Sequence, residues 1–191
     1  MIERISDRVS VDRSAGRTSV VIDARATPAK RALITAWTIA WVACGVAVLV
    51  ERAQLAPGDP LRQYLLAFIA FWAYFLVMIG KALLWRWRGL ELWRVKDGRF
   101  TIKDSILGYG RAHDYFVENI QALGLIKEDR ASWKWQWNNS LWVVGGERLG
   151  FEHLGRKVVF GKGLGDEEAR RLAAVLKDAL KEARRLSAPK G

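Results

Sequence analysis

Three side chains of this sequence are of the kinds that most often bind metals or transfer protons near neutral pH: Cys44, His113 and His153. A zinc site needs several such ligands, but there is no second cysteine, and neither histidine has a His or Glu partner at helical spacing. A lone cysteine also rules out a disulfide within the chain and a CxxC redox pair. We therefore expect no metal and no cofactor, haem included, and interpret Cys44 as a small packing residue.

No segment matches the motifs of a nucleophilic or phosphate-binding site. A G-x-S-x-G nucleophile elbow is absent, and the glycines at 108/110 and 161/163 lack the spacing of a phosphate-binding loop. The carboxylates Asp104, Asp114 and Glu118 alternate with basic residues, which is typical of a solvated sheet face. The sequence therefore favours a protein that is not an enzyme and has no small-molecule substrate.

Tryptophan is the abundant residue type with functional potential, with 10 in 191 residues. Trp133, Trp135 and Trp137 alternate with polar residues, so a predicted strand over 132–137 would place three indoles on one face. These rings could pack in the core with Trp93, Phe100 and Trp142, or they could contact a protein partner or lipid headgroups, since tryptophan is frequent at interfaces. We predict a partner interface and leave the core alternative open.

Two long apolar runs, 32–50 and 65–80, predict a pair of membrane-spanning helices. The first run has 19 residues and would rise about 28 Å as a helix, close to the ~30 Å of bilayer hydrocarbon. We place the spans at about 32–50 and 63–85, in a hairpin over 32–88. Small residues that would let the two helices approach are Gly45, Ala70 and Ala73. The alternative is a hydrophobic hairpin buried within a soluble protein.

The basic residues are distributed asymmetrically around this predicted hairpin. The chain is 51% hydrophobic with a formal charge of +11, made up of +3 (7 minus 4) in 1–31, zero (2 minus 2) in 51–62 and +8 (22 minus 14) in 81–191. By the positive-inside rule both termini face the cytoplasm. The membrane-interface and anionic-lipid contacts that we predict are Lys81, Trp85, Arg86, Trp87, Arg88 and Arg94. Because topology and lipid attraction account for the charge, we expect no nucleic-acid partner.

The segment 89–187 predicts a small cytoplasmic α+β domain, followed by a tail at 188–191. Alternating residues on both sides of Asp97-Gly98 predict a β-hairpin. A helical period over 166–186 predicts an amphipathic helix with acidic residues in its first turn and basic residues in its last. Further predicted strands are 113–118, 120–126, 132–137, 140–145, 147–153 and 156–161.

This order, with the run 155–164 (GRKVVFGKGL) leading into 166–176, resembles bacterial pleckstrin-homology-like (PH-like) domains. More specifically, the chain resembles an uncharacterised family of small bacterial integral membrane proteins with two spans and such a domain. The resemblance covers about 32–186 and implies a curled seven-stranded antiparallel sheet closed by a C-terminal helix. It implies no particular reaction.

The first 31 residues are polar apart from Val20, Val21 and Ile22, and we predict a separate arm whose apolar island adds a strand to a partner's sheet. The whole pattern predicts a non-catalytic accessory subunit of a larger complex in the bacterial inner membrane, of a respiratory or photosynthetic kind. Its partners would be other subunits of that complex. The alternative is a transient assembly factor or a module that senses anionic lipid.

Overall fold

A computed structural model of the chain describes residues 2–14, 16–127 and 131–187, and these form two compact units. One unit is a helical hairpin, residues 26–87 together with 141–144, and the other is a sheet domain formed by the remaining residues. In chain order the elements are β1 Ile2–Ser6, β2 Val9–Ser14, β3 Arg17–Asp23, α1 Pro28–Gln54, α2 Leu61–Arg88, β4 Gly89–Lys96, β5 Arg99–Ile106, β6 Ala112–Phe116, the 3-10 turn η1 Val117–Asn119, β7 Ile120–Leu125, α3 Trp133–Asn138, β8 Glu147–His153, β9 Arg156–Lys162 and α4 Asp166–Ser187.

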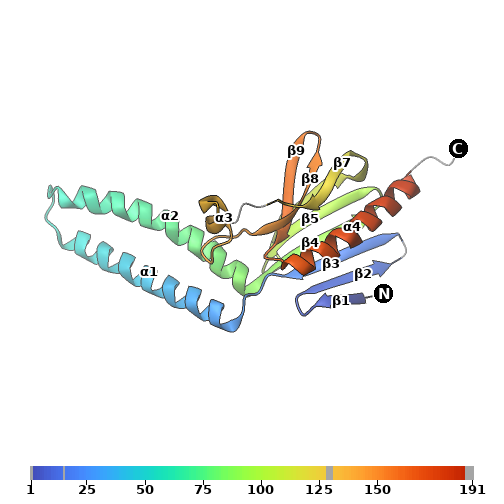
Figure 1. Ribbon diagram of the computed structural model, residues 1–191. Helices are drawn as coiled ribbons and strands as arrows, with labels where there is room; N and C mark the ends of the chain where they lie inside the picture. The colour runs from blue at the N-terminus through green and yellow to red at the C-terminus, as the bar shows by residue number, and fades with distance from the viewer. Residues whose placement is uncertain (1, 15, 128–130, 188–191) are drawn as a thin grey trace. The chain divides into compact units, whose positions relative to one another are not determined.

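The two apolar runs form the long antiparallel helices α1 and α2, as predicted (Figure 1). Both helices extend beyond the predicted spans, to 27 and 28 residues. Pro28 stands at the start of α1, where its missing N–H leaves no hydrogen bond unmade. At the connection, the Asp59 side chain accepts a hydrogen bond from the Leu61 amide (2.8 Å), which caps the first turn of α2.

The sheet domain begins before the hairpin, which corrects the predicted N-terminal arm. β1, β2 and β3 form the first three strands of a six-stranded antiparallel sheet ordered β1-β2-β3-β4-β5-β6. Val9, Val11, Val20 and Ile22 point inward at period two and are buried, while the residues between them are polar or half-buried. The composition of β1–β3 is polar overall because only one face of each strand is apolar.

The helical hairpin is an insertion between two neighbouring strands. β3 and β4 pair in register from Arg17 opposite Lys96 to Asp23 opposite Leu90, and the whole of α1 and α2 lies between them in the chain. The ladder continues as the Ala24 amide donates to the Gly89 carbonyl. The start of α1 and the end of α2 are therefore attached to adjacent strand ends.

A second sheet and α4 complete the sheet domain. The second sheet has three antiparallel strands in the order β7-β8-β9. Trp93, Phe100, Phe151 and Phe160 stack edge to face in the core, and the predicted roles of Trp93 and Phe100 in that core are confirmed. The apolar face predicted for α4 is buried against them, with the buried residues Ala169, Leu172, Ala173, Leu176, Ala179 and Leu180.

Some predicted strands have a different structure. The β-hairpin at Asp97-Gly98 is confirmed, with positive φ at both residues as a tight hairpin turn requires. The predicted strand over 132–137 is wrong, because α3 occupies that segment, and 140–145 is irregular. The described residues contain nine strands in two sheets, against the seven that the resemblance implies, and three of them precede the hairpin.

Candidate functional site

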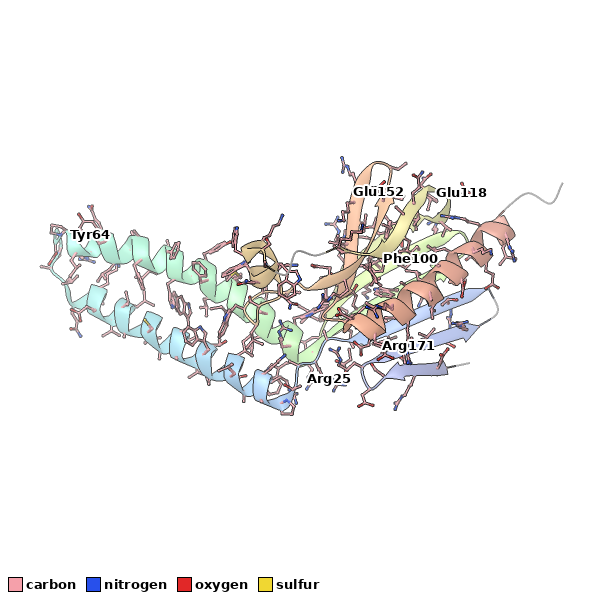
Figure 2. The ribbon with its side chains drawn as sticks, viewed as in Figure 1. Arg25, Tyr64, Phe100, Glu118, Glu152 and Arg171 are labelled. Carbon is pink, nitrogen blue, oxygen red and sulfur yellow. The ribbon has the colours of Figure 1, made fainter. Side chains whose placement is uncertain are left out.

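The largest feature that the sheet domain does not use is the surface of the helical hairpin. Both helices are long and apolar enough to cross a membrane, and only 11% of the apolar window of each is buried. Figure 2 shows side chains projecting outward along both helices, with Tyr64 near the turn. A soluble monomer rarely exposes an apolar surface of this extent. The hairpin is therefore the first candidate site, as a surface that needs an apolar environment.

The two helices contact each other through Gly45 and a pair of tryptophans. The Trp72 indole N–H donates to the Trp41 carbonyl (2.9 Å), and the Trp41 indole N–H donates to the Trp72 carbonyl (3.4 Å). Trp72 lies directly on Gly45, where an added Cβ would stand 2.1 Å from its ring. Gly45 is thus placed where the sequence predicted, between the helices, whereas Ala70 is exposed and Ala73 is half-buried. Ala70 therefore does not lie between α1 and α2 in this chain, and its role in helix packing stays a prediction.

The open end of the hairpin combines basic and aromatic side chains. The Arg31 guanidinium lies 5.1 Å from the centre of the Trp87 ring, and the Trp87 indole N–H donates to the Thr35 hydroxyl (3.2 Å). This cation–π contact holds the ring at the helix end. Trp85, in contrast, is 3% exposed, so the prediction that its ring meets lipid is wrong. Of the predicted basic contacts, Arg86 is half-buried, while the exposed ones are Lys81, Arg88 and Arg94.

A short segment of the chain far from the helices in sequence belongs to the same unit as the hairpin. Leu141–Val144 is wholly apolar and groups with α1 and α2. The Trp142 and Trp37 rings lie 5.2 Å apart. Val143 and Val144 line a hollow of about 340 Å³ together with residues of α2, namely Tyr74, Val77, Met78 and Lys81. No pattern in the sequence pointed to this arrangement, because a four-residue apolar run has no diagnostic period.

The three alternating tryptophans do not share one face. In α3, Trp133 and Trp137 are one helical turn apart, while Trp135 points elsewhere. Trp133 is 78% exposed and Trp137 is 46% exposed, whereas Trp135 is half-buried. The core alternative is therefore wrong for Trp133 and Trp137, and Trp142 lies with the hairpin, outside the core of the sheet domain. Trp133 and Trp137 are therefore two exposed indoles for which the fold of the sheet domain gives no packing role.

The predicted strand addition by Val20, Val21 and Ile22 to a partner's sheet is corrected. These residues belong to β3, whose two edges are already paired with β2 and β4. Val20 and Ile22 are almost fully buried in the protein's own core. A strand that is paired on both sides has no free backbone groups to offer, so this segment is not a partner interface.

A buried carboxylate, which the sequence analysis missed, connects the two sheets. Glu91 of β4 is fully buried and accepts hydrogen bonds from the Trp93 indole N–H (2.9 Å), the Gly161 amide (2.7 Å) and the Lys162 amide (2.8 Å). The Lys162 ammonium donates to Asp104, which lies directly opposite Glu91 on β5 (2.6 Å). Period two places Glu91 on the same inward face as Trp93, and this was the available signal.

The electrostatic environment of Lys162 favours the charged form of this lysine, which links the two sheets. Burial of the ammonium lowers its pKa, but the charge of Glu91 and the hydrogen bond and charge of Asp104 outweigh burial and raise it above the ordinary value. A raised pKa keeps the lysine charged at every physiological pH. Lys162 therefore stays a charged partner of Asp104 and of the Glu91 carboxylate.

A second polar cluster ties the N-terminal strands to α4. Glu168 accepts hydrogen bonds from the Ser6 hydroxyl (2.6 Å), the Arg8 guanidinium (3.0 Å) and the Gly165 amide (2.8 Å). Burial raises the pKa of the Glu168 carboxyl, but these hydrogen bonds and the Arg8 charge outweigh it and lower the pKa below 4.5. These contacts are specific to an N-terminus that folds as part of the sheet.

This cluster predicts an acid-dependent loss of stability. Because the folded pKa of Glu168 is lowered, its contribution is present above pH 4.5 and is lost as the pH falls through the folded pKa. We expect E168Q to lower the free energy of unfolding by about 1 kcal/mol at pH 7 and to flatten its decline below pH 4.5. Urea unfolding at pH 7 and pH 3.5 measures both effects. The control E167Q changes an exposed neighbour, and equal slopes in the two variants would contradict the prediction.

A hollow of about 560 Å³ in the sheet domain lies between β7 and α4. It is open to solvent, and its polar residues Glu118, Lys177 and Arg184 carry mixed charges. Arg184 already donates to the Val117 and Ile120 carbonyls, so it closes part of the β7 edge. We assign no ligand to this hollow.

Among the described residues, no group of three or more His, Cys, Asp or Glu side chains could hold a metal ion. Comparison of the chain with protein-family models and with curated proteins gives no match.

Proposed function

We propose that the chain is a membrane-anchored, non-catalytic accessory subunit of a larger inner-membrane protein complex. In this proposal α1 and α2 cross the bilayer as a hairpin, and the sheet domain lies on the cytoplasmic side. The observation that carries the proposal is the pair of exposed apolar helices inserted between the neighbouring strands β3 and β4. A sheet domain attached to the membrane through two adjacent strands is suited to presenting a protein-binding surface close to the bilayer.

The charges at the two ends of the hairpin support the orientation. The open end carries Lys30, Arg31, Arg86 and Arg88 with no acidic residue in either terminal turn, whereas the connection 51–62 carries two basic and two acidic residues. Basic residues that flank spans remain on the cytoplasmic side. The helices are about 40 Å long at ~1.5 Å per residue, which matches a bilayer with its headgroup regions.

A second function, that of a transient assembly factor or an anionic-lipid sensor, is favoured by one specific observation. Lys81, Arg88 and Arg94 are exposed, and basic side chains near a membrane surface attract anionic lipid by about 1 kcal/mol each. The arrangement of two antiparallel sheets and a C-terminal helix supports a PH-like fold for the domain, with β1–β3 as an addition that precedes the hairpin.

The two functions differ in how the protein behaves after gentle extraction from its native membrane. A stable subunit should co-migrate with a large complex in stoichiometric amount when native mass is measured in a mild detergent. A transient factor or lipid sensor should instead be recovered mostly free. Recovery of the chain alone as a monomer would contradict the subunit proposal.

The orientation has its own prediction, which the single cysteine makes simple to test. In a C44A background, A56C places a thiol in the connection, and R111C places one in the sheet domain; both parent residues are exposed. A membrane-impermeant maleimide added to intact bacterial spheroplasts should label A56C and spare R111C until the membrane is opened. The reverse labelling pattern would overturn the orientation and, with it, a cytoplasmic sheet domain.

A further inference from the structure

We propose that the apolar segment Leu141–Val144, which belongs to the same compact unit as the helical hairpin, forms a third membrane element that lies in the interfacial layer of the bilayer. This inference rests on the proposed membrane function of the hairpin and deepens it. The segment contacts phospholipid, and contact with another protein is one of the outcomes that the experiment distinguishes.

The first step is the position of the apolar segment on the hairpin. Leu141–Val144 packs with the part of the helices that is exposed and apolar, through Trp142 beside Trp37 and through Val143 and Val144 beside Val77. The membrane-facing surface of the hairpin is therefore continuous with this segment. A segment that packs on the flank of a membrane helix shares the environment of that helix.

The position of Leu141–Val144 along the two helices sets its depth in the bilayer. Trp37 lies nine residues beyond Pro28, which is about 14 Å from the open end of α1, and Val77 lies eleven residues before Arg88, about 16 Å from the end of α2. Helices of about 40 Å exceed the ~30 Å hydrocarbon by about 5 Å at each end. Leu141–Val144 is thus placed roughly 10 Å below the hydrocarbon boundary, within the range of interfacial elements.

The third step is the chemistry of the residues. All four residues of Leu141–Val144 are apolar, and the indole ring of Trp142 favours the interfacial level of a bilayer. Lys81 lines the hollow beside Val143 and Val144. An apolar hollow with an ammonium at its edge suits an acyl chain whose headgroup carries a phosphate.

Polar contacts hold together the two ends of the loop that carries the segment. Asn138 at the end of α3 donates to Glu147 at the start of β8 (2.9 Å), so the two ends of the intervening loop lie together. Gly145 faces Asn138, and an added Cβ would stand 2.3 Å from its side-chain oxygen. A loop with a closed polar base and an apolar tip buries its tip at little cost, because its backbone is already ordered.

The test uses fluorescent labels on single cysteines in the full chain, reconstituted into vesicles of phosphatidylcholine and phosphatidylglycerol. The native Cys44 in α1 is the hydrocarbon reference. In a C44A background, V143C reports on the apolar segment. L154C, an exposed apolar residue in the β8–β9 turn, is the matched control.

We expect nitroxide-labelled lipids to quench labels at Cys44 and V143C at least three times more strongly than at L154C, and aqueous iodide to show the opposite order. Quenching of Cys44 but not of V143C would overturn this inference and leave the hairpin in the membrane. Shielding of V143C from both quenchers would indicate a protein contact and also overturn it. Loss of lipid quenching at Cys44 itself would overturn the proposed function.

Discussion

Replacement of Glu91 by alanine should destabilise the sheet domain by about 3–5 kcal/mol, the largest effect that we expect from a single substitution. The carboxylate is fully buried and accepts three hydrogen bonds, and its removal leaves the Gly161 and Lys162 amides and the Trp93 indole N–H without an acceptor. Loss of one member of a buried charged cluster costs about this much because the remaining groups stay desolvated. E91Q should cost less, about 2–3 kcal/mol, since its amide keeps one acceptor oxygen.

The measurement is urea unfolding of the full chain in detergent micelles, with hydrogen exchange at the Gly161 and Lys162 amides as a local probe. E152A is the matched control, because Glu152 is an exposed glutamate on a strand, and it should stay within about 0.5 kcal/mol of the parent. Equal unfolding midpoints for E91A and E152A would show that Glu91 does not join the two sheets.

The Glu91 cluster also shows where reasoning from sequence stopped. The alternation over β4 places Glu91 on the face of Trp93 and Val95, so a buried acid could be suspected. Its partners could not be predicted, because Gly161 and Lys162 lie 70 and 71 residues later and only the packing of one sheet against the other brings them close. Hydrogen bonds between distant strands leave no local pattern in a sequence.

Elements with a strong local signal were predicted, and elements that depend on distant partners were not. Three local patterns determine structure without distant partners: the uncharged runs, the helical period and Asp97-Gly98. They correspond to α1, α2, α4 and the β4–β5 turn. The strands β1–β3 are short, and β3 pairs with β4 across an insertion of more than 60 residues, so their one-sided apolar pattern was interpreted as a polar arm.

In the tryptophan-rich segment the sequence has a regular strand-like pattern, but the structure has a helix there. Trp133, Trp135 and Trp137 have the period of a strand, but a strand is stable only beside a partner, and the described ladders leave none for this segment. A single helical turn satisfies its own backbone hydrogen bonds, as the Asn139 amide does by donating to the Trp135 carbonyl. The exposure of Trp133 and Trp137 could therefore only come from the structure.

Replacement of Gly45 by alanine should separate the two long helices and destabilise the hairpin by about 2–3 kcal/mol. An added Cβ would stand 2.1 Å from Cζ2 of Trp72, so the indole must move and the reciprocal hydrogen bonds between Trp41 and Trp72 are strained or lost. Overpacking of a tight contact costs about 1–3 kcal/mol, and interhelical hydrogen bonds in bilayers add about 0.6 kcal/mol each.

G80A is the matched control for this substitution, because Gly80 lies in α2 and an added Cβ meets nothing within 4 Å. Alanine has the higher helix propensity, so G80A should leave the hairpin unchanged or stabilise it by up to about 1 kcal/mol. Titration of mixed micelles with dodecyl sulfate, followed by tryptophan fluorescence, measures both variants. Because Trp72 is the ring displaced, G45A should also shift the emission of the folded hairpin, and G80A should not; identical titrations would show that the helices do not meet at Gly45.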